Sequence, residues 1–199
     1  AMISNKSYRL KRGESRKVIL INGFLGSGKT SLLLSLIKIL SMHKVACVVN
    51  EFGEVSIDGP QVESYDVIKH EINKGSIFCS CKAHEFISVM NDLLQLDLEY
   101  ILVETSGFSN PSSLQTLLSH MNNFDVMKNL SIVTVVDSVL FPKLVTVLPM
   151  LRKQIEVSTT IVINKIDLIN EEQLGLLRDM IQKINEKSIV VETQFSEFP

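Results

Sequence analysis

The chain has 199 residues, 45% of them hydrophobic and 6% aromatic, and its 20 basic and 22 acidic side chains leave a formal charge of −2. This length is enough for one domain with a sizeable core. A nearly balanced charge argues against nucleic acid as a partner, and the lack of a long apolar run argues against a membrane. Three cysteines without a disulfide framework, and an N-terminus without a signal-peptide pattern, lead us to expect a cytoplasmic protein.

Apolar runs that end in polar turns alternate with helical patterns along the chain, which predicts an α/β fold with a mostly parallel sheet. The expected strands are residues 18–21, 45–49, 101–103, 132–136, 160–163 and 189–191, with a further short strand at 67–72. The expected helices are residues 30–41, 84–96, 112–122, 140–151 and 171–185. Residues 1–16 are expected to form a flexible basic arm, and residues 17–199 the folded domain.

Residues 23–30 read Gly-Phe-Leu-Gly-Ser-Gly-Lys-Thr, between an apolar strand pattern and a leucine-rich helix pattern. Gly23, Gly26 and Gly28 allow the backbone to turn its N–H groups toward phosphates, and the helix dipole adds positive potential there. Lys29 is expected to pair with the β- and γ-phosphates, and the Thr30 hydroxyl to bind Mg²⁺. A chance glycine turn would not explain the preceding strand. The sequence therefore predicts a nucleoside triphosphate site in a P-loop three-layer sandwich with helices on both faces of the sheet.

A second motif, Asn164-Lys165-Ile166-Asp167, follows an apolar strand pattern and indicates which base is bound. The Asp167 carboxylate is suited to accept from the N1–H and the 2-amino group of guanine, which adenine lacks. Asn164 is expected to bond the N7/O6 edge of the base or to tie this loop to the phosphate loop, and the Lys165 stem to cover the base plane. The alternative is an ordinary strand-to-helix turn in which Asp167 caps the helix. Together with the phosphate loop, the motif favours GTP.

The carboxyl ends of parallel strands are where chemistry collects in such sheets. Five residues fall at expected strand ends, namely Gly23, Asn50, Glu104, Asp137 and Asn164.

Further motifs at these ends are Asn-Glu-Phe-Gly-Glu-Val-Ser-Ile-Asp from residue 50 and Glu-Thr-Ser-Gly-Phe-Ser-Asn-Pro from residue 104. With the two loops above and the strand Ile-Val-Thr-Val-Val-Asp from residue 132, the chain closely resembles the CobW family of P-loop GTPases over residues 18–192. In that family, and in the related hydrogenase and urease accessory GTPases, GTP hydrolysis is coupled to delivery of zinc, cobalt or nickel. The resemblance implies a metallochaperone or a metalloenzyme or cobalamin-related maturation factor, acting on a client metalloprotein or maturation complex.

The position of Glu104 at a strand end indicates a further role in the site. Glu104 would bind Mg²⁺ directly or through water, and Gly107 would offer a backbone N–H near the γ-phosphate. The resemblance places an acidic loop, residues 50–58, beside the nucleotide. In this loop Glu51 is the first choice to complete the magnesium shell or to orient the attacking water, although a merely solvated loop is the alternative. The expected catalytic residues are thus Lys29, Glu51 and Glu104, and the nucleotide-binding set also includes Ser27 and Ser31. No arginine lies in an obvious finger position, so slow turnover is expected.

The cysteine motif departs from the family, whose members typically carry Gly-Cys-Ile-Cys-Cys after the acidic loop. This chain reads Gly-Ser-Ile-Phe-Cys-Ser-Cys from residue 75, so that Cys79 is retained and Cys81 is an addition. With His84, these thiolates would offer three ligands for Zn²⁺ or Co²⁺ and leave an open position. Two ordinary thiols, a redox pair and the remnant of a lost metal site are the alternatives.

Family members commonly continue into a C-terminal domain, which this chain is expected to lack because it ends at Pro199. A homodimer formed across bound nucleotides is a further expectation from the resemblance. Three other functions compete with a GTP-driven metal carrier. They are a metal-free, GTP-dependent activator of a client enzyme, a small-molecule kinase, and a pure binding module, which Lys29 and Thr30 argue against.

Overall fold

The computed structural model describes residues 16–49, 67–71, 80–107, 113, 116, 119 and 129–196, and for 67–71 and 80–85 it describes the backbone only. Within this part of the chain, seven strands form one sheet in the order β3-β2-β4-β1-β5-β6-β7, and every neighbouring pair is parallel. The strands are β1 Lys17–Gly23, β2 Val45–Val49, β3 Val67–Glu71, β4 Tyr100–Glu104, β5 Leu130–Asp137, β6 Thr160–Asn164 and β7 Ile189–Glu192. The short strand expected near residue 67 is confirmed as β3 at the edge of the sheet.

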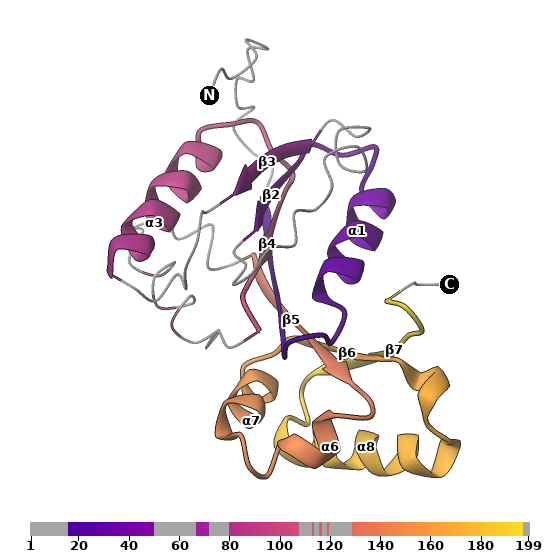
Figure 1. Cartoon of the computed structure of the whole chain (residues 1–199). Helices are drawn as coiled ribbons and strands as arrows, with labels where there is room; N and C mark the ends of the chain where they lie inside the picture. The colour runs from indigo at the N-terminus through magenta and orange to yellow at the C-terminus, as the bar shows by residue number, and fades with distance from the viewer. Residues whose placement is uncertain are drawn as a thin grey trace.

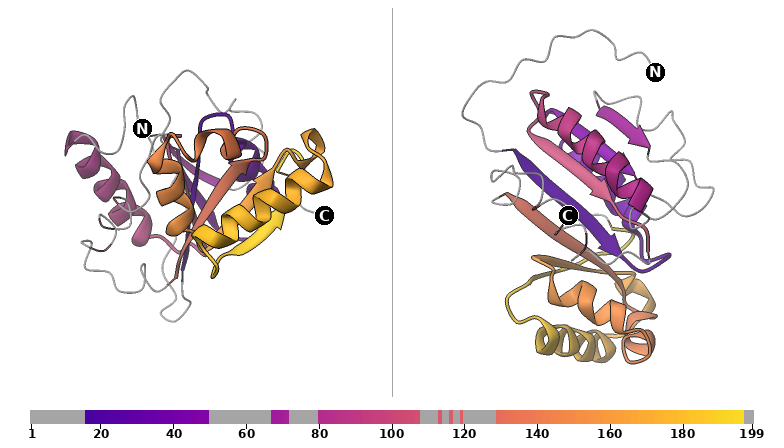
Figure 2. Two further views of the ribbon diagram at one scale, coloured as in Figure 1. Left: turned by 90° about the horizontal axis from the view of Figure 1, so that it is seen from below. Right: turned by 90° about the vertical axis from the view of Figure 1, so that its left-hand side faces the viewer.

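The helices cover the sheet on both sides (Figure 1). They are α1 Lys29–Ile39, α3 Ser80–Leu94, α6 Phe141–Leu144, α7 Pro149–Glu156 and α8 Glu171–Ile184, with a short 3₁₀ helix η1 Ile166–Leu168. Helix α1 lies on the face of the sheet opposite α3, while α6, α7 and α8 gather around β5, β6 and β7 (Figures 1 and 2). The predicted α/β three-layer P-loop fold is confirmed.

The core follows the alternation of side chains along the central strands. In β4, Ile101 and Val103 pack with Phe86 of α3, whereas Leu102 between them packs with Leu33 of α1. A strand with both faces covered must be apolar throughout, which is why these strands read as continuous hydrophobic runs. Burial on both faces fixes β4 and β1 in the middle of the sheet, so their carboxyl ends give the loops attached to them a rigid base.

The single helix expected at residues 140–151 is wrong, because the chain forms α6 and α7 there with a turn between them. Pro149 occupies the first position of α7. Proline has no N–H to donate and clashes with the preceding helical turn, so it is tolerated at a helix start but not in the interior. Helix α3 begins at Ser80, earlier than the expected residue 84. Of the helix expected at 112–122, the described residues 113, 116 and 119 are helical.

Arg16 fastens the start of β1 to the end of α3. Its guanidinium donates to the carbonyl oxygens of Leu94, Leu96 and Leu98 at 2.7, 2.9 and 3.3 Å. The last carbonyls of a helix have no partner within the helix, so a basic side chain there is favourable.

None of the helices in the described part of the chain is both long and apolar enough to cross a membrane.

Gly175 gives a test of the local helix energetics. It lies within α8, and a Cβ added there would meet no heavy atom within 4 Å. Glycine in a helix interior is less favourable than alanine by about 0.5–1 kcal/mol, so Gly175→Ala should raise the free energy of unfolding by about that amount in urea titrations. Gly26→Ala is the control, because its site is equally open but has a φ of +72°. The account fails if both variants are stabilised alike.

Candidate nucleotide site

The loop between β1 and α1 can only be built with glycines at three positions. Gly23, Gly26 and Gly28 have φ values of 142°, 72° and 107°, which L side chains rarely adopt. A Cβ on Gly23 would also lie 2.4 Å from the carbonyl oxygen of Val135 on the neighbouring strand β5. The loop therefore wraps closely over the ends of β1 and β5, and its backbone leads directly into the first turn of α1.

The Asn164 side chain connects the phosphate loop to the end of β6. Its Nδ2 donates to the carbonyl oxygen of Ser27 at 2.9 Å, and the residue is only 2% exposed. A Cβ on Gly28 would approach that Nδ2 to 2.3 Å, so this glycine allows the contact. Of the two roles expected for Asn164, the structure shows the tie to the phosphate loop.

The same amide also holds residues 193–196 after β7, which we call the C-terminal turn. Asn164 Oδ1 accepts from the backbone N–H of Ser196 at 2.8 Å and from Thr193 Oγ1 at 3.3 Å. Ser196 Oγ then donates to the carbonyl oxygen of Gly28 at 3.2 Å. Phe195 and Ser196 reach these positions with φ values of 53° and 55°, a conformation uncommon for residues other than glycine. Three segments distant in the sequence are thus joined at one buried side chain.

Thr30 and Glu104 form the second feature of the site. Thr30 Oγ1 donates to Glu104 Oε1 at 2.8 Å, and Glu104 is 2% exposed at the end of β4. A hydroxyl and a carboxylate oxygen at this separation are the kind of ligands that Mg²⁺ prefers. Gly107 follows on the same side, since a Cβ there would lie 2.6 Å from the backbone nitrogen of Leu25. The chain after β4 therefore runs against the tip of the phosphate loop.

Lys29 lies under the loop rather than in solvent. It is 8% exposed, and its Nζ donates to the carbonyl oxygen of Phe24 at 3.2 Å across the turn. The ammonium is thus already at the loop that would receive the phosphates. Ser27 is fully buried within the loop, whereas Ser31 is exposed in the first turn of α1.

Asp167 is not a helix cap. It lies exposed in η1, and the N-cap of α8 is Asn170, which forms a capping box with Gln173. The two residues exchange hydrogen bonds at 2.9 and 3.0 Å, so the helix start is already satisfied without Asp167. The helix cap that was the alternative role for Asp167 is therefore taken by Asn170.

Lys165, between these two residues, bonds to the end of the neighbouring strand. Its Nζ donates to Asp137 Oδ2 at 2.6 Å, and the side chains are 33% and 5% exposed respectively. Burial alone would raise the pKa of Asp137, but the hydrogen bonds from Lys165, Leu140 and Val139, together with the lysine charge, hold it below its ordinary value. The carboxylate is therefore the charged partner of Lys165 at neutral pH.

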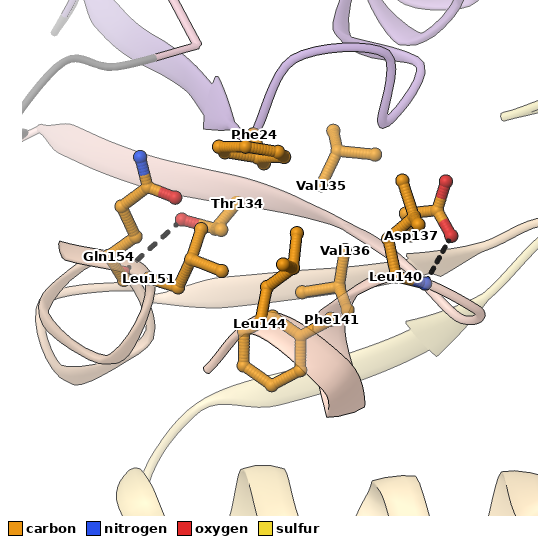
Figure 3. Close-up of a pocket in the computed structure, with 10 residues that line it drawn as sticks. All are labelled: Phe24, Thr134, Val135, Val136, Asp137, Leu140, Phe141, Leu144, Leu151 and Gln154. Carbon is orange, nitrogen blue, oxygen red and sulfur yellow. Dashed lines mark hydrogen bonds between the residues drawn. The ribbon is translucent and has the colours of Figure 1, made fainter. Parts of the chain in front are cut away.

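A small cavity lies on the buried side of the phosphate loop (Figure 3). The Phe24 ring covers it, and Thr134, Phe141, Leu151 and Gln154 are among the residues that line it. It encloses about 10 Å³, which is the size of one water at most. The cavity is too small for a nucleotide, and Phe24 serves to seat the loop on β5, α6 and α7.

The residues expected to bind the transition metal are only partly within reach. Cys79 and Glu51 lie outside the described residues, while Cys81 and His84 lie in the first turns of α3, with only their backbone described. Within the described residues, no group of three or more His, Cys, Asp or Glu side chains could hold a metal ion.

The third cysteine, Cys47, is buried in β2. This burial, with a smaller effect of the Glu104 charge, raises its pKa to about 12.

Thr193, Ser196 and the Asp137–Lys165 pair were not predicted from the sequence as parts of this site. Asp137 was expected at a strand end, but its partner depends on which strands are neighbours. Ser196 follows a short strand at the far end of the chain, and only the order β5-β6-β7 brings it under the phosphate loop. Of these residues, only Thr193 carries a sequence signal, as a hydroxyl side chain directly after a strand.

Comparison with known proteins places this geometry among nucleotide-binding domains. The family model described as the CobW/HypB/UreG nucleotide-binding domain matches residues 17–192. The "Zinc chaperone CobW" of Pseudomonas aeruginosa is 34% identical over 131 residues, covering 61% of this chain and 35% of that protein. The "Zinc chaperone YjiA" of Escherichia coli is 27% identical over 180 residues, covering 87% of this chain and 56% of that protein.

A eukaryotic relative, the "Zinc-regulated GTPase metalloprotein activator 1" of Dictyostelium discoideum, is 25% identical and covers 94% of this chain and 47% of that protein. The chain thus spans between 35% and 56% of the length of these curated relatives.

Among solved structures, the hydrogenase maturation factor HypB of Archaeoglobus fulgidus aligns with a TM-score of 0.63 at 21% identity, covering 90% of this chain and 82% of that chain. Zn(II)-bound YjiA from Escherichia coli aligns with a TM-score of 0.65, also at 21% identity, covering 89% of this chain and 57% of that chain. These likenesses support the fold.

Proposed function

We propose that this chain, which belongs to the CobW/HypB/UreG family of nucleotide-binding domains, binds GTP with Mg²⁺ and hydrolyses it. The observation that carries the proposal is the hydrogen bond from Asn164 Nδ2 to the carbonyl oxygen of Ser27. It brings the Asn-Lys-x-Asp motif within contact of the phosphate loop, although the two are far apart in the sequence. A nucleotide with its phosphates on the loop would therefore extend its base toward Asp167.

Each part of the site has a distinct task in this proposal. Lys29 and the backbone N–H groups of the loop would neutralise the phosphate charge, and Thr30 and Glu104 would hold Mg²⁺, whose two protein ligands are already within hydrogen-bond distance. Magnesium, when bound, offsets the negative charge on the transferred phosphate. Gly107 would place a backbone N–H beside the γ-phosphate, and Glu51 would complete the magnesium shell or orient water.

We further propose that hydrolysis is coupled to carrying a transition metal, with zinc as cargo, for a client metalloprotein. The curated relatives are named as zinc chaperones or zinc-regulated metalloprotein activators. The strand register supports coupling, because Val49 at the end of β2 faces both Glu104 of β4 and Glu71 of β3. The chain that leads to Cys79 and Cys81 therefore leaves the sheet at the same carboxyl end as the magnesium ligand Glu104, with β2 between the two strands.

Asp167→Asn tests the base assignment. The new amide can donate to the C2 carbonyl of xanthine but cannot accept from the 2-amino group of guanine. GTP affinity should fall by about 2–4 kcal/mol, as expected for loss of a charge-assisted contact, while XTP affinity should rise. Competition against a fluorescent GDP analogue measures both.

Asp179→Asn is the matched control for this change, because Asp179 is an exposed carboxylate on α8. It should leave both affinities as in the wild type. A wild-type protein that binds ATP as tightly as GTP, or an Asp167→Asn variant with an unchanged GTP/ATP ratio, would show that the base assignment is wrong.

A double change of Cys79→Ser with Cys81→Ser tests the metal cargo. Reduced wild-type protein should bind Co²⁺ with a thiolate charge-transfer band in the near ultraviolet, and the variant should lose that band without loss of GTP binding. Metal that prefers the GTP form must raise GTP affinity by the same factor, about 5–150-fold where two sites are coupled.

Cys47→Ala is the control, since its thiol stays protonated at neutral pH and should contribute nothing to the cobalt spectrum. If the spectrum of the double variant equals that of the wild type, the cysteine motif binds no metal. The metal-free, GTP-dependent activator would then be the better account.

A further inference from the structure

Asp137 is the last residue of β5, and every oxygen of its buried carboxylate has a defined task. Its Oδ1 accepts from the backbone N–H groups of Val139 and Leu140, both at 2.9 Å, and Figure 3 shows the bond from Leu140. Its Oδ2 accepts from Lys165 Nζ at 2.6 Å. The carboxylate thus shapes the turn before α6 with one oxygen and holds a lysine of the neighbouring loop with the other.

A second residue at the end of β5 holds the backbone of the same lysine. Ser138 Oγ donates to the carbonyl oxygen of Lys165 at 2.7 Å, and the Ser138 N–H donates to the carbonyl oxygen of Asn164 at 3.1 Å. Lys165 itself has a φ of 63°. A non-glycine residue is strained in this conformation and persists there only where its surroundings fix it. The end of β5 provides those contacts.

The direction of the Lys165 side chain follows from the register. Asp137 and Asn164 face each other across the parallel pair of β5 and β6, and Lys165 comes directly after Asn164. With its ammonium at Asp137, the methylene stem must cross from the end of β6 to the end of β5. The stem therefore lies along the edge of the sheet on which the phosphate loop also sits.

The position of the Lys165 ammonium also bears on the neighbouring Asp167. Lys165 is two residues from Asp167, and an ammonium without Asp137 would be attracted to that exposed carboxylate. A carboxylate paired with lysine has fewer oxygen lone pairs to offer the N1–H and 2-amino groups of guanine. Holding the ammonium at β5 keeps Asp167 available to the base.

We infer that Asp137 is a positioning residue for guanine selectivity, which stretches the Lys165 stem over the base site and keeps its ammonium away from Asp167. This rests on the proposed function, since it concerns the base of the same nucleotide. A pair that served only the fold would stabilise the protein without any effect on the choice of base. The two roles are therefore separable by measuring selectivity and stability in the same variants.

The experiment is a double-mutant cycle with Asp137→Asn and Lys165→Met. The asparagine retains an oxygen for Val139 and Leu140 but releases the ammonium, and methionine retains an apolar stem without a charge. Dissociation constants for GDP, IDP and ADP are measured by competition, and thermal unfolding is measured without nucleotide. Asp137→Asn should lower the preference for GDP over ADP and over IDP by about tenfold, the scale of coupling between residues in contact.

In the Lys165→Met background, Asp137→Asn should change these ratios by less than about twofold, because the ammonium that it releases is already absent. Glu99→Gln is the matched control. Glu99 also accepts a backbone N–H, from Lys44 at 2.9 Å, and contacts the His43 imidazole, but it precedes β4 and so lies at the amino ends of the strands, away from the carboxyl ends that carry Asp137 and Asn164. Its replacement should leave all three ratios unchanged.

Asp137→Glu retains the charge of the ion pair, so it should fold even if Asp137→Asn does not. Its longer side chain moves the ammonium by one methylene, so it should lower the GDP/ADP ratio partially. Selectivity equal to the wild type in the variants that fold, with only the unfolding temperature lowered, would overturn the inference. An equal effect of Asp137→Asn in both backgrounds would overturn it too. A wild-type protein without preference for GDP over ADP would instead refute the proposed function itself.

Discussion

The buried amide of Asn164 is the contact on which the geometry of the site depends. It donates to the phosphate loop at Ser27 and accepts from the C-terminal turn at Ser196 and Thr193. A buried amide must have its polar atoms paired, because an unpaired one costs about 1–3 kcal/mol. The pairing of Asn164 therefore sets the distance between the Asn-Lys-x-Asp segment, which would bind a base, and the phosphate loop.

This contact works because the strand ends beneath it are fixed. Behind the phosphate loop, Thr105 Oγ1 bonds to Asn22 Oδ1 and Asn22 Nδ2 to Thr134 Oγ1, both at 3.3 Å, and Thr134 bonds to Ser158 at 2.6 Å. All four residues are buried, and satisfied polar networks in a protein interior are rigid. The ends of β4 and β1 are thereby linked, through Thr134 within β5, to Ser158 after α7. A displacement of Thr105 after β4 would therefore disturb its bond to Asn22, which lies directly before the phosphate loop.

Most of the fold follows from the sequence, because apolar runs, glycines and polar strand ends repeat in a regular order. The strand at residues 45–49 was predicted with its observed bounds. The single helix predicted at 140–151 is wrong. Its hydrophobic residues have helical spacing, but Pro149 cannot lie in a helix interior and begins α7 instead. In the site, the motif residues were recognisable from spacing, but the partners of Asn164 and Lys165 were not. Hydrogen bonds between the ends of different strands depend on strand order, which local patterns do not contain. The roles of Glu51, Cys79, Cys81 and His84, and the nucleotide-dependent dimer, stay predictions.

Amide hydrogen exchange in nucleotide-free protein tests the role of Asn164 most directly. The account predicts that the Ser196 N–H is protected in the wild type and exchanges much faster in Asn164→Ala. The Thr193 N–H, which donates to the carbonyl oxygen of Ile163 at 2.8 Å, should keep its protection in both and shows that β6 and β7 remain paired. If Ser196 exchanges at the same rate in both proteins, Asn164 does not hold the C-terminal turn to the phosphate loop, and the account of how this site is assembled is contradicted.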